Sequence, residues 1–303
     1  MAHAVFDGLP DTPLVTTDWL AAHLGDEGLV LLDATVLAVP GFGTATAYVS
    51  GDEEYLAKGH IPGAVFADLL ESFSDPEGEY PFTHPDAKHF ERAAQSVGVD
   101  AETAVVVYDN ALGQWAARLW WLFRAFGYDD VRVLDGGLKK WVAEGRELAL
   151  GYVPPRKAGE FYADERDELW ADKTYVEAVV RGESDAVLVC GLPPREFSGE
   201  QSPRLRPGHI PGSVNAPAGW LVDRDTNAFL PAERLREVLG LAAETDSPVV
   251  TYCGSAIAAT ADALALTLIG HDDVRVYDGS LNEWASDANA PLEGSSLAAA
   301  RRP

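Results

Sequence analysis

Cysteine is nearly absent from this chain, which has only Cys190 and Cys253 among its 303 residues. Two cysteines cannot build a disulfide framework or a cysteine-rich metal site, so we expect a reducing, cytoplasmic setting and no metal or other cofactor. Free cysteines are commonly buried and inert, which favours a core role for Cys190 at the end of a predicted strand. A redox partnership with Cys253 is the weaker alternative.

Basic residues are also scarce. The chain carries 23 Lys and Arg against 48 Asp and Glu, for a formal net charge of -25. Nucleic acid and anionic membrane surfaces are excluded as partners because both need clustered positive charge. An acidic protein repels anions, so a site for an anionic substrate has to be built from a few local arginines.

Long apolar runs are missing as well. Runs such as 264–269 are too short to span a bilayer, and residues 1–14 lack the basic and apolar segments of a signal peptide. We therefore expect a soluble protein. A hydrophobic fraction of 47% over this length is enough for the cores of two domains.

Several sequence blocks occur twice in the same order, which indicates the duplication of a whole domain. The repeated pairs are Gly59–Ala64 with Gly208–Ser213 (Gly-His-Ile-Pro-Gly), Val131–Trp141 with Val274–Trp284 (Val-Arg-Val-x-Asp-Gly), Leu29–Asp33 with Ala186–Cys190, and Ala104–Asp109 with Pro248–Cys253. Gly and Pro in the first block suit a tight turn, and the structural interpretation of its histidine is favoured. The Trp that ends the last block of each half suits core packing.

Apolar runs in each half alternate with segments of helical length, at 86–97, 114–126, 231–239 and 259–269. This alternation predicts an α/β fold in which each half forms a parallel sheet flanked by helices. Residues 150–161 are rich in Pro and Gly, as is typical of a linker. We predict a first domain at 11–149, a linker at 150–168 and a second domain at 169–292.

The best candidate for chemistry is Cys253. It follows an apolar strand and precedes a loop of small residues and a helix. Loop N–H groups and the positive end of the helix dipole both favour a thiolate at such a position, which predicts a nucleophilic cysteine.

Together, the repeated blocks and the Cys-Gly-Ser loop resemble those of a tandem-domain rhodanese-type sulfurtransferase, over about residues 14–291. The resemblance implies two tandem rhodanese-like domains with the active site between them. It also implies that the first domain is inactive, because Asp109 stands where the second domain has Cys253. Cys253 would take a sulfur atom as a persulfide and pass it to a thiol, thioredoxin or cyanide.

Within this family, enzymes that use thiosulfate usually carry basic residues after the cysteine, and those that use 3-mercaptopyruvate carry Cys-Gly-Ser-Gly-Val-Thr. The uncharged loop of this chain resembles the second group at its first three positions and departs from it at Ala256, Ile257 and Ala258. If the family's glycine has a positive φ, Ala256 is strained by roughly 1 kcal/mol or more.

The resemblance implies Cys253, Ser255, His60 and Asp52 as catalytic residues, with His60 reaching across the cleft to Ser255. It implies two substrate-binding arginines, for which Arg195 and Arg204 match best and Arg206 is a substitute. The loop residues Gly254, Ala256, Ile257 and Ala258 would complete the substrate site.

Three alternatives stay open. A cysteine phosphatase fits poorly, because no arginine closes the loop after Cys253. The retention of Cys253 and Ser255 argues against a non-catalytic sulfur-relay or binding module. The uncharged loop argues against a thiosulfate sulfurtransferase. The expected partners are a small-molecule sulfur donor and a thiol or thioredoxin-like acceptor, with the protein a monomer or weak dimer.

Overall fold

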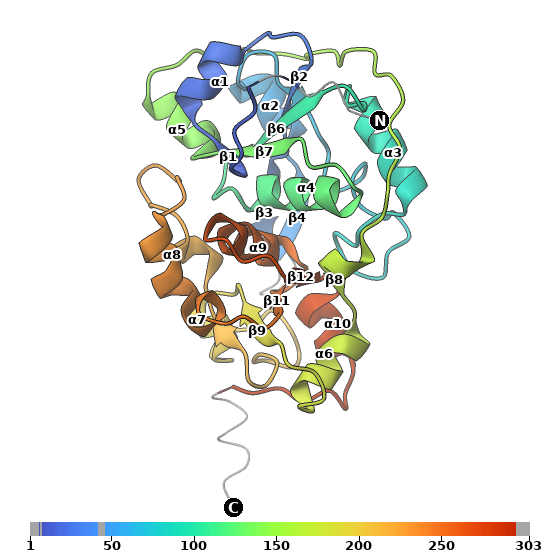
Figure 1. Ribbon diagram of the computed structural model, residues 1–303, viewed down its shortest axis with the longest axis vertical. Helices are drawn as coiled ribbons and strands as arrows, with labels where there is room; N and C mark the ends of the chain where they lie inside the picture. The colour runs from blue at the N-terminus through green and yellow to red at the C-terminus, as the bar shows by residue number, and fades with distance from the viewer. Residues whose placement is uncertain (1–5, 7, 42–45, 295–303) are drawn as a thin grey trace, which may run out of the picture.

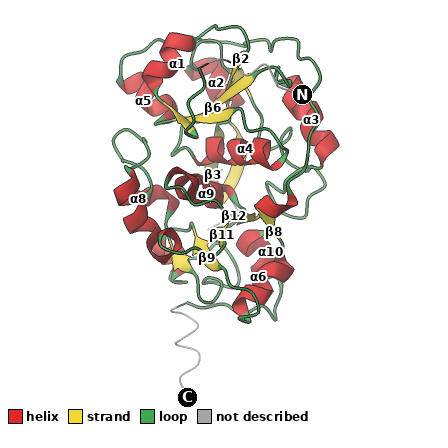
Figure 2. Cartoon of the chain, in the orientation of Figure 1, coloured by secondary structure: helices red, strands yellow, loops and turns green. Residues whose placement is uncertain are grey.

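The computed structural model describes residues 6, 8–41 and 46–294, which form two α/β domains, the first above the second in Figure 1. Each domain contains a five-stranded sheet in which every pair of neighbouring strands is parallel. The strand orders are β1-β7-β6-β2-β5 and β10-β9-β11-β12-β8. Helices flank the sheets (Figure 2), which confirms the fold predicted from the sequence.

The elements follow the duplicated order. The first domain contains β1 (Leu14–Val15), α1 (Thr17–His23), β2 (Leu29–Asp33), β3 (Val36–Pro40), β4 (Thr46–Ser50), α2 (Asp52–Lys58), β5 (Val65–Phe66), α3 (Ala87–Ser96), β6 (Ala104–Tyr108), α4 (Gln114–Ala125), β7 (Val131–Leu134) and α5 (Gly137–Ala143). The second contains η1 (Asp167–Leu169), β8 (Trp170–Ala171), α6 (Lys173–Val180), β9 (Val187–Cys190), α7 (Pro194–Phe197), β10 (Val214–Asn215), η2 (Ala218–Trp220), α8 (Ala232–Leu239), η3 (Gly240–Ala243), β11 (Val249–Tyr252), α9 (Ile257–Leu268), β12 (Val274–Tyr277) and α10 (Ser280–Ser286).

Strand side chains in the first domain alternate between the two faces of the sheet, as the pleat requires. Leu31 and Val106 pack in a small cluster with residues of α1 and α5. Their neighbours along the strands, such as Val30 and Val107, pack on the other face in a larger cluster with α3 and α4. The continuous apolar runs seen in the sequence therefore fill two cores.

Each Gly-His-Ile-Pro-Gly block is hydrogen-bonded to the chain near the end of its own domain. His60 and Ala149 exchange two backbone hydrogen bonds of 3.0 and 2.9 Å, and His209 and Glu293 do the same at 2.8 and 2.9 Å. A Cβ atom on Gly208 would lie 2.2 Å from the carbonyl oxygen of Glu293, so only glycine permits this approach. In both domains the repeated block therefore anchors the last segment of the domain to its body.

The tryptophan that ends each later block lies in the core, as expected. Trp141 and Trp284 are at most 2% exposed. Their indole N–H groups donate to the backbone carbonyls of Glu147 and Pro291 at 2.9 and 2.8 Å. Each buried ring thus has its one polar atom satisfied.

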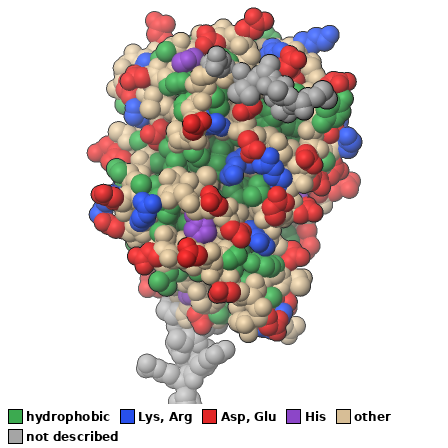
Figure 3. Space-filling model, viewed as in Figure 1, with side chains coloured by type: hydrophobic (Ala, Val, Ile, Leu, Met, Phe, Trp, Pro, Cys, Tyr) green, Lys and Arg blue, Asp and Glu red, His purple; other side chains and the backbone are tan. Residues whose placement is uncertain are grey.

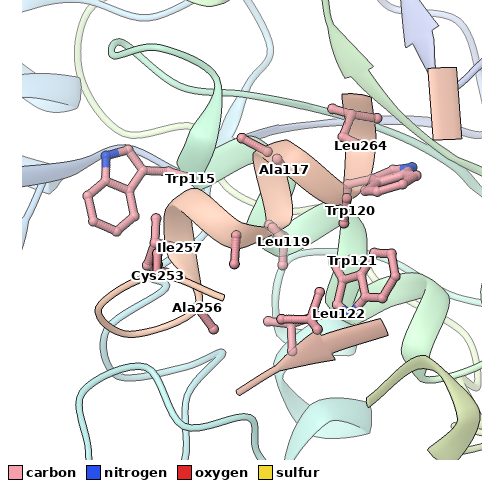
Figure 4. Close-up of a cluster of buried hydrophobic side chains, with 14 of the residues drawn as sticks. Trp115, Ala117, Leu119, Trp120, Trp121, Leu122, Cys253, Ala256, Ile257 and Leu264 are labelled. Atoms are coloured by element: carbon pink, nitrogen blue, oxygen red, sulfur yellow. The ribbon is translucent and has the colours of Figure 1, made fainter. Parts of the chain in front are cut away.

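Helices α4 and α9 pack against each other across the domain interface, and one hydrophobic cluster runs through both domains. Figure 4 shows buried side chains of both helices beside Cys253, Ala256 and Ile257. Helix α9 begins at Ile257, two residues before the predicted start. Its first turn therefore lies directly behind the cysteine loop.

Acidic side chains are spread over the visible face of the molecule, with basic groups scattered among them (Figure 3). None of the helices in the described part of the chain has both the length and the apolar character needed to cross a membrane.

Candidate active site

Cys253 lies at the carboxyl end of β11, where it opens on a cleft of about 670 Å³. Its side chain is buried, with 3% of the residue exposed. Both domains line the cleft: Thr46, Ala47, Tyr48, Leu70, Pro81, Leu112, Gln114 and Trp115 come from the first, and Gly191, Leu192, Pro193, Glu196, Pro203, Arg204, Ala218, Gly219, Cys253, Gly254, Ser255, Ile257, Ala258 and Asn282 from the second. The thiol is thus enclosed between the domains.

Ser280 holds the cysteine loop in shape. Its buried hydroxyl oxygen accepts hydrogen bonds from the N–H groups of Cys253 and Ala256, both at 3.1 Å. The same hydroxyl donates to the carbonyl of Tyr277 at 2.8 Å. Ala256 has φ 60° and ψ 9°, the left-handed conformation anticipated for this position. Its methyl group is buried outside the cleft lining, so Ala256 shapes the loop and does not face a substrate.

The start of α9 provides a site for an anion. No side chain caps the helix, and its first turn contains no acidic residue. The first N–H groups of a helix have no partner within it, and with the helix dipole they attract negative charge. Ile257 and Ala258, the first two residues of α9, line the cleft beside Cys253.

In the first domain, backbone N–H groups of the equivalent loop donate hydrogen bonds to a carboxylate. Asp109, at the position of Cys253, accepts four backbone N–H hydrogen bonds through its two carboxylate oxygens. The donors are Ala111, Gly113, Trp115 and Ala116, at 2.8 to 3.0 Å. Burial raises the pKa of Asp109, and these N–H groups act in the opposite direction. The burial effect is the larger one, so the loop N–H groups offset only part of the cost of a buried negative charge at this position.

Arg204 is the one cationic side chain among the cleft-lining residues of the described chain. Its guanidinium lies over Gly254, where a Cβ atom would come within 2.3 Å of Nη2. Its Nε donates to Asn282 Oδ1 at 3.3 Å, and Nη1 lies 3.7 Å from Glu196 Oε2. These contacts hold a positive charge beside the cysteine loop while leaving it only partly neutralised.

The two other candidate arginines lie elsewhere. Arg195 has a side chain that is 66% exposed, and it pairs with Glu200 at 3.4 Å outside the cleft lining. Arg206 donates to the backbone carbonyls of Asp287 and Ala290, which secures the chain after α10. Of the three candidate arginines, Arg204 is the one that lines the cleft.

The structure corrects the expected role of His60. The residue is fully buried, and its ring stacks on Tyr55 with centroids 4.0 Å apart. Its Nδ1 lies 3.0 Å from the carbonyl oxygen of Ile61 and its Nε2 lies 3.0 Å from that of Gly151. His60 is therefore engaged in closing its own domain and does not reach Ser255.

Asp52 is not a partner of His60 either. It is the exposed first residue of α2, and its backbone N–H lies 3.4 Å from Ser50 Oγ. A carboxylate at this position interacts favourably with the positive end of the helix dipole. Ser255, in contrast, does line the cleft and is 9% exposed.

Cys190 occupies the position that Asp33 has in the first domain. It pairs with Tyr252 in the second sheet, as Asp33 pairs with Tyr108 in the first. The residue is fully buried, and burial raises the pKa of its thiol. A protonated thiol in the core is a poor nucleophile, which favours the structural interpretation.

Sequence reasoning missed Tyr48, Glu196, Asn282 and Ser280. Ser280 had a detectable signal, because Gly-Ser in the second repeated block replaces Gly-Gly in the first. Tyr48 belongs to the β3–β4 hairpin, which has no counterpart among residues 150–294 of the second half. Its place in the cleft depends on how the domains dock.

Cys253 thus lies at the end of a parallel strand, between a helix N-terminus and a cleft formed by two α/β domains. This arrangement is typical of enzymes that work through a thiolate nucleophile. The family model for the rhodanese-like domain matches residues 16–144 and 192–287. The chain belongs to this family.

Several relatives are similar over nearly the whole chain. The 3-mercaptopyruvate sulfurtransferase of Escherichia coli K12 is 34% identical over 285 residues, covering 93% of this chain and 98% of the relative. The human 3-mercaptopyruvate sulfurtransferase is 36% identical over 281 residues, covering 89% and 91%. Among solved structures, SseA from Escherichia coli, described as a 3-mercaptopyruvate sulfotransferase with the rhodanese fold, matches with a TM-score of 0.76 and 33% identity, covering 89% and 98%.

Proposed function

We propose that this protein is a sulfurtransferase that moves a sulfur atom from 3-mercaptopyruvate, through a persulfide on Cys253, to a thiol or cyanide acceptor. The observation that carries the proposal is the placement of Cys253 at the base of the interdomain cleft, with the α9 N-terminus behind it. The names of the relatives that match along almost their full length agree with it.

In the first half-reaction the Cys253 thiolate attacks the sulfur of the donor. The new S–S bond forms as the C–S bond breaks, and the electron pair of the C–S bond leaves on pyruvate as its enolate. The sulfur proton moves from the enzyme persulfide to the enolate carbon, which gives pyruvate and an anionic persulfide. The loop N–H groups donate to the thiolate and to the persulfide anion, as those of the first-domain loop donate to the Asp109 carboxylate.

In the second half-reaction an acceptor thiolate attacks the outer sulfur of the persulfide. The S–S bond breaks, its electron pair returns to Cys253, and the acceptor carries the sulfur away. Cyanide attacks in the same way and leaves as thiocyanate. Two successive displacements through one covalent intermediate give ping-pong kinetics.

The charge of the cleft favours a donor with one carboxylate. Arg204 can bind a planar carboxylate through two N–H groups, a geometry that suits a guanidinium. Among the described residues that line the cleft, Arg204 is the one positive side chain and Glu196 the one negative side chain, with Nη1 3.7 Å from Oε2. A dianion such as thiosulfate finds no second cation there.

Intact-mass spectrometry of the protein after incubation with 3-mercaptopyruvate, or with thiosulfate, tests the proposal. We expect 3-mercaptopyruvate to add the mass of one sulfur atom to the wild type and none to Cys253→Ser, and a thiol to remove it. If neither donor adds a sulfur atom, the enzyme assignment is wrong. If thiosulfate gives the larger kcat/KM, only the donor assignment is wrong.

A further inference from the structure

The β3–β4 hairpin is the one pair of strands in the described chain that lies outside the two parallel sheets. It leaves the first domain just after β2, and its base is closed by a hydrogen bond of 3.1 Å from the Gly51 N–H to the Thr35 carbonyl. Figure 1 shows the hairpin between the two domains, beyond α4. Thr46, Ala47 and Tyr48 of β4 line the cleft that contains Cys253.

Tyr48 is held in this wall by two neighbouring rings. Its ring centroid lies 5.2 Å from that of Phe82 and 5.6 Å from that of Trp115, both in edge-on arrangements. Phe82 and Trp115 are at most 4% exposed, so they form a fixed support. The Tyr48 hydroxyl has no hydrogen-bond partner among residues 6, 8–41 and 46–294, which leaves it available to a ligand in the cleft.

Cys253 and Arg204 both influence the pKa of the Tyr48 phenol. Burial raises its pKa, the negative charge of Cys253 raises it further, and the positive charge of Arg204 lowers it. Tyr48 therefore lies within electrostatic reach of both side chains across the cleft. A phenol under these influences keeps its proton at neutral pH and acts as a hydrogen-bond donor.

The donor molecule supplies a matching acceptor. In 3-mercaptopyruvate the ketone carbon lies between the CH₂–SH group and the carboxylate. With the sulfur at Cys253 and the carboxylate at Arg204, the ketone oxygen lies between these two anchor points. Tyr48, Cys253 and Arg204 all line the same cleft, with Tyr48 supplied by the opposite domain.

We propose that the Tyr48 hydroxyl binds the ketone oxygen of the donor and stabilises the enolate that leaves when the C–S bond breaks. The proposal rests on the sulfurtransferase function proposed above. Tyr48 keeps its own proton throughout, and the electron pair of the C–S bond becomes the enolate charge on the oxygen that the hydroxyl faces.

The test is Tyr48→Phe, which removes the hydroxyl and keeps the ring packing against Phe82 and Trp115. The matched control is Tyr152→Phe, because Tyr152 is 71% exposed and lies outside the cleft lining. Persulfide formation is measured with 3-mercaptopyruvate and with thiosulfate, whose leaving group is sulfite and has no ketone. The circular dichroism spectrum and the unfolding midpoint of each variant verify its fold.

We expect Tyr48→Phe to lower kcat/KM for 3-mercaptopyruvate by about 10- to 100-fold, mostly through kcat, since the hydrogen bond strengthens as charge develops on the oxygen. The value for thiosulfate should change less than about threefold, as should both values in Tyr152→Phe. An unchanged rate with 3-mercaptopyruvate, or an equal loss with both donors, overturns the role of Tyr48. A wild type that takes no sulfur from either donor instead overturns the proposed function, and the role of Tyr48 with it.

Discussion

Arg118 of the first domain and Asp278 of the second form an ion pair across the domain interface, with Nη2 and Oδ1 2.7 Å apart. The Arg118 side chain is 1% exposed and that of Asp278 is 13% exposed. The other carboxylate oxygen of Asp278 accepts the His84 N–H at 2.9 Å. In the first domain Asp135, the repeat counterpart of Asp278, accepts the Phe229 N–H at 2.8 Å. The equivalent aspartate of each repeat thus forms a hydrogen bond or ion pair with the opposite domain.

Replacing Asp278 with asparagine should destabilise the protein by about 3 kcal/mol, because it leaves the Arg118 charge buried without its partner. Urea denaturation measures the change. Asp129→Asn is the matched control, since Asp129 also pairs with an arginine, Arg166, but is 58% exposed. That surface pair should contribute about 1 kcal/mol or less. Equal losses in the two variants would contradict a special role for the interface pair.

Arg204→Ala should raise KM for 3-mercaptopyruvate about tenfold or more, because the donor carboxylate loses a charge-assisted hydrogen bond. The effect on thiosulfate should be smaller, since loop N–H groups remain for its oxygens. Steady-state kinetics with both donors check this expectation. Arg195→Ala is the control, and its KM values should stay within about twofold of the wild type, as expected for an exposed side chain. Equal increases in KM for both donors would remove the carboxylate role of Arg204.

Ser280→Ala should weaken both stability and catalysis. It deprives the buried N–H groups of Cys253 and Ala256 of their acceptor, at a cost of about 2 kcal/mol or more. The released loop should also form the persulfide more slowly, which rapid-mixing kinetics can measure. Ser286→Ala, which removes an exposed hydroxyl, should change neither property. A fully active Ser280→Ala enzyme would show that the loop keeps its shape without this contact.

Asp262 predicts a pH dependence of stability. It is fully buried in α9, neither carboxyl oxygen has a hydrogen-bond partner among the described residues, and burial raises its pKa well above the usual value. The folded state therefore binds a proton that the unfolded state releases above about pH 4. The stability from this proton is complete below that pH and is lost as the pH rises, by about 1.4 kcal/mol per pH unit until the folded-state pKa is reached.

Asp262→Asn should remove this contribution. The free energy of unfolding of the variant minus that of the wild type should therefore increase from pH 5 to pH 8. Denaturation measured across that range checks this. Asp26→Asn, at an exposed turn, serves as control and should leave the pH profile unchanged. A wild type and an Asp262→Asn variant with parallel profiles would mean that Asp262 has an ordinary pKa in the folded protein.

The sequence by itself determined the duplicated α/β fold and pointed to Cys253 as the candidate nucleophile. Apolar strands, turn glycines and the Cys253 loop are local features, and their pattern survives in both halves because each half folds around its own sheet. A left-handed Ala256 was expected only on the condition that the family's glycine at this position has a positive φ, and the structure has it. The prediction that Asp109 cannot be a sulfur nucleophile follows from residue chemistry alone.

Only the tertiary structure decided which side chains surround the thiol. His60 lies close to Gly151 in its own domain, whereas Arg195 and Arg204, nine positions apart in sequence, end up outside and inside the cleft. Tyr48 lines the cleft that contains Cys253 because the β3–β4 hairpin of the first domain lies between the two domains. The composition of a cleft between domains depends on contacts between distant residues and on the docking of α4 on α9, and no local sequence pattern encodes it.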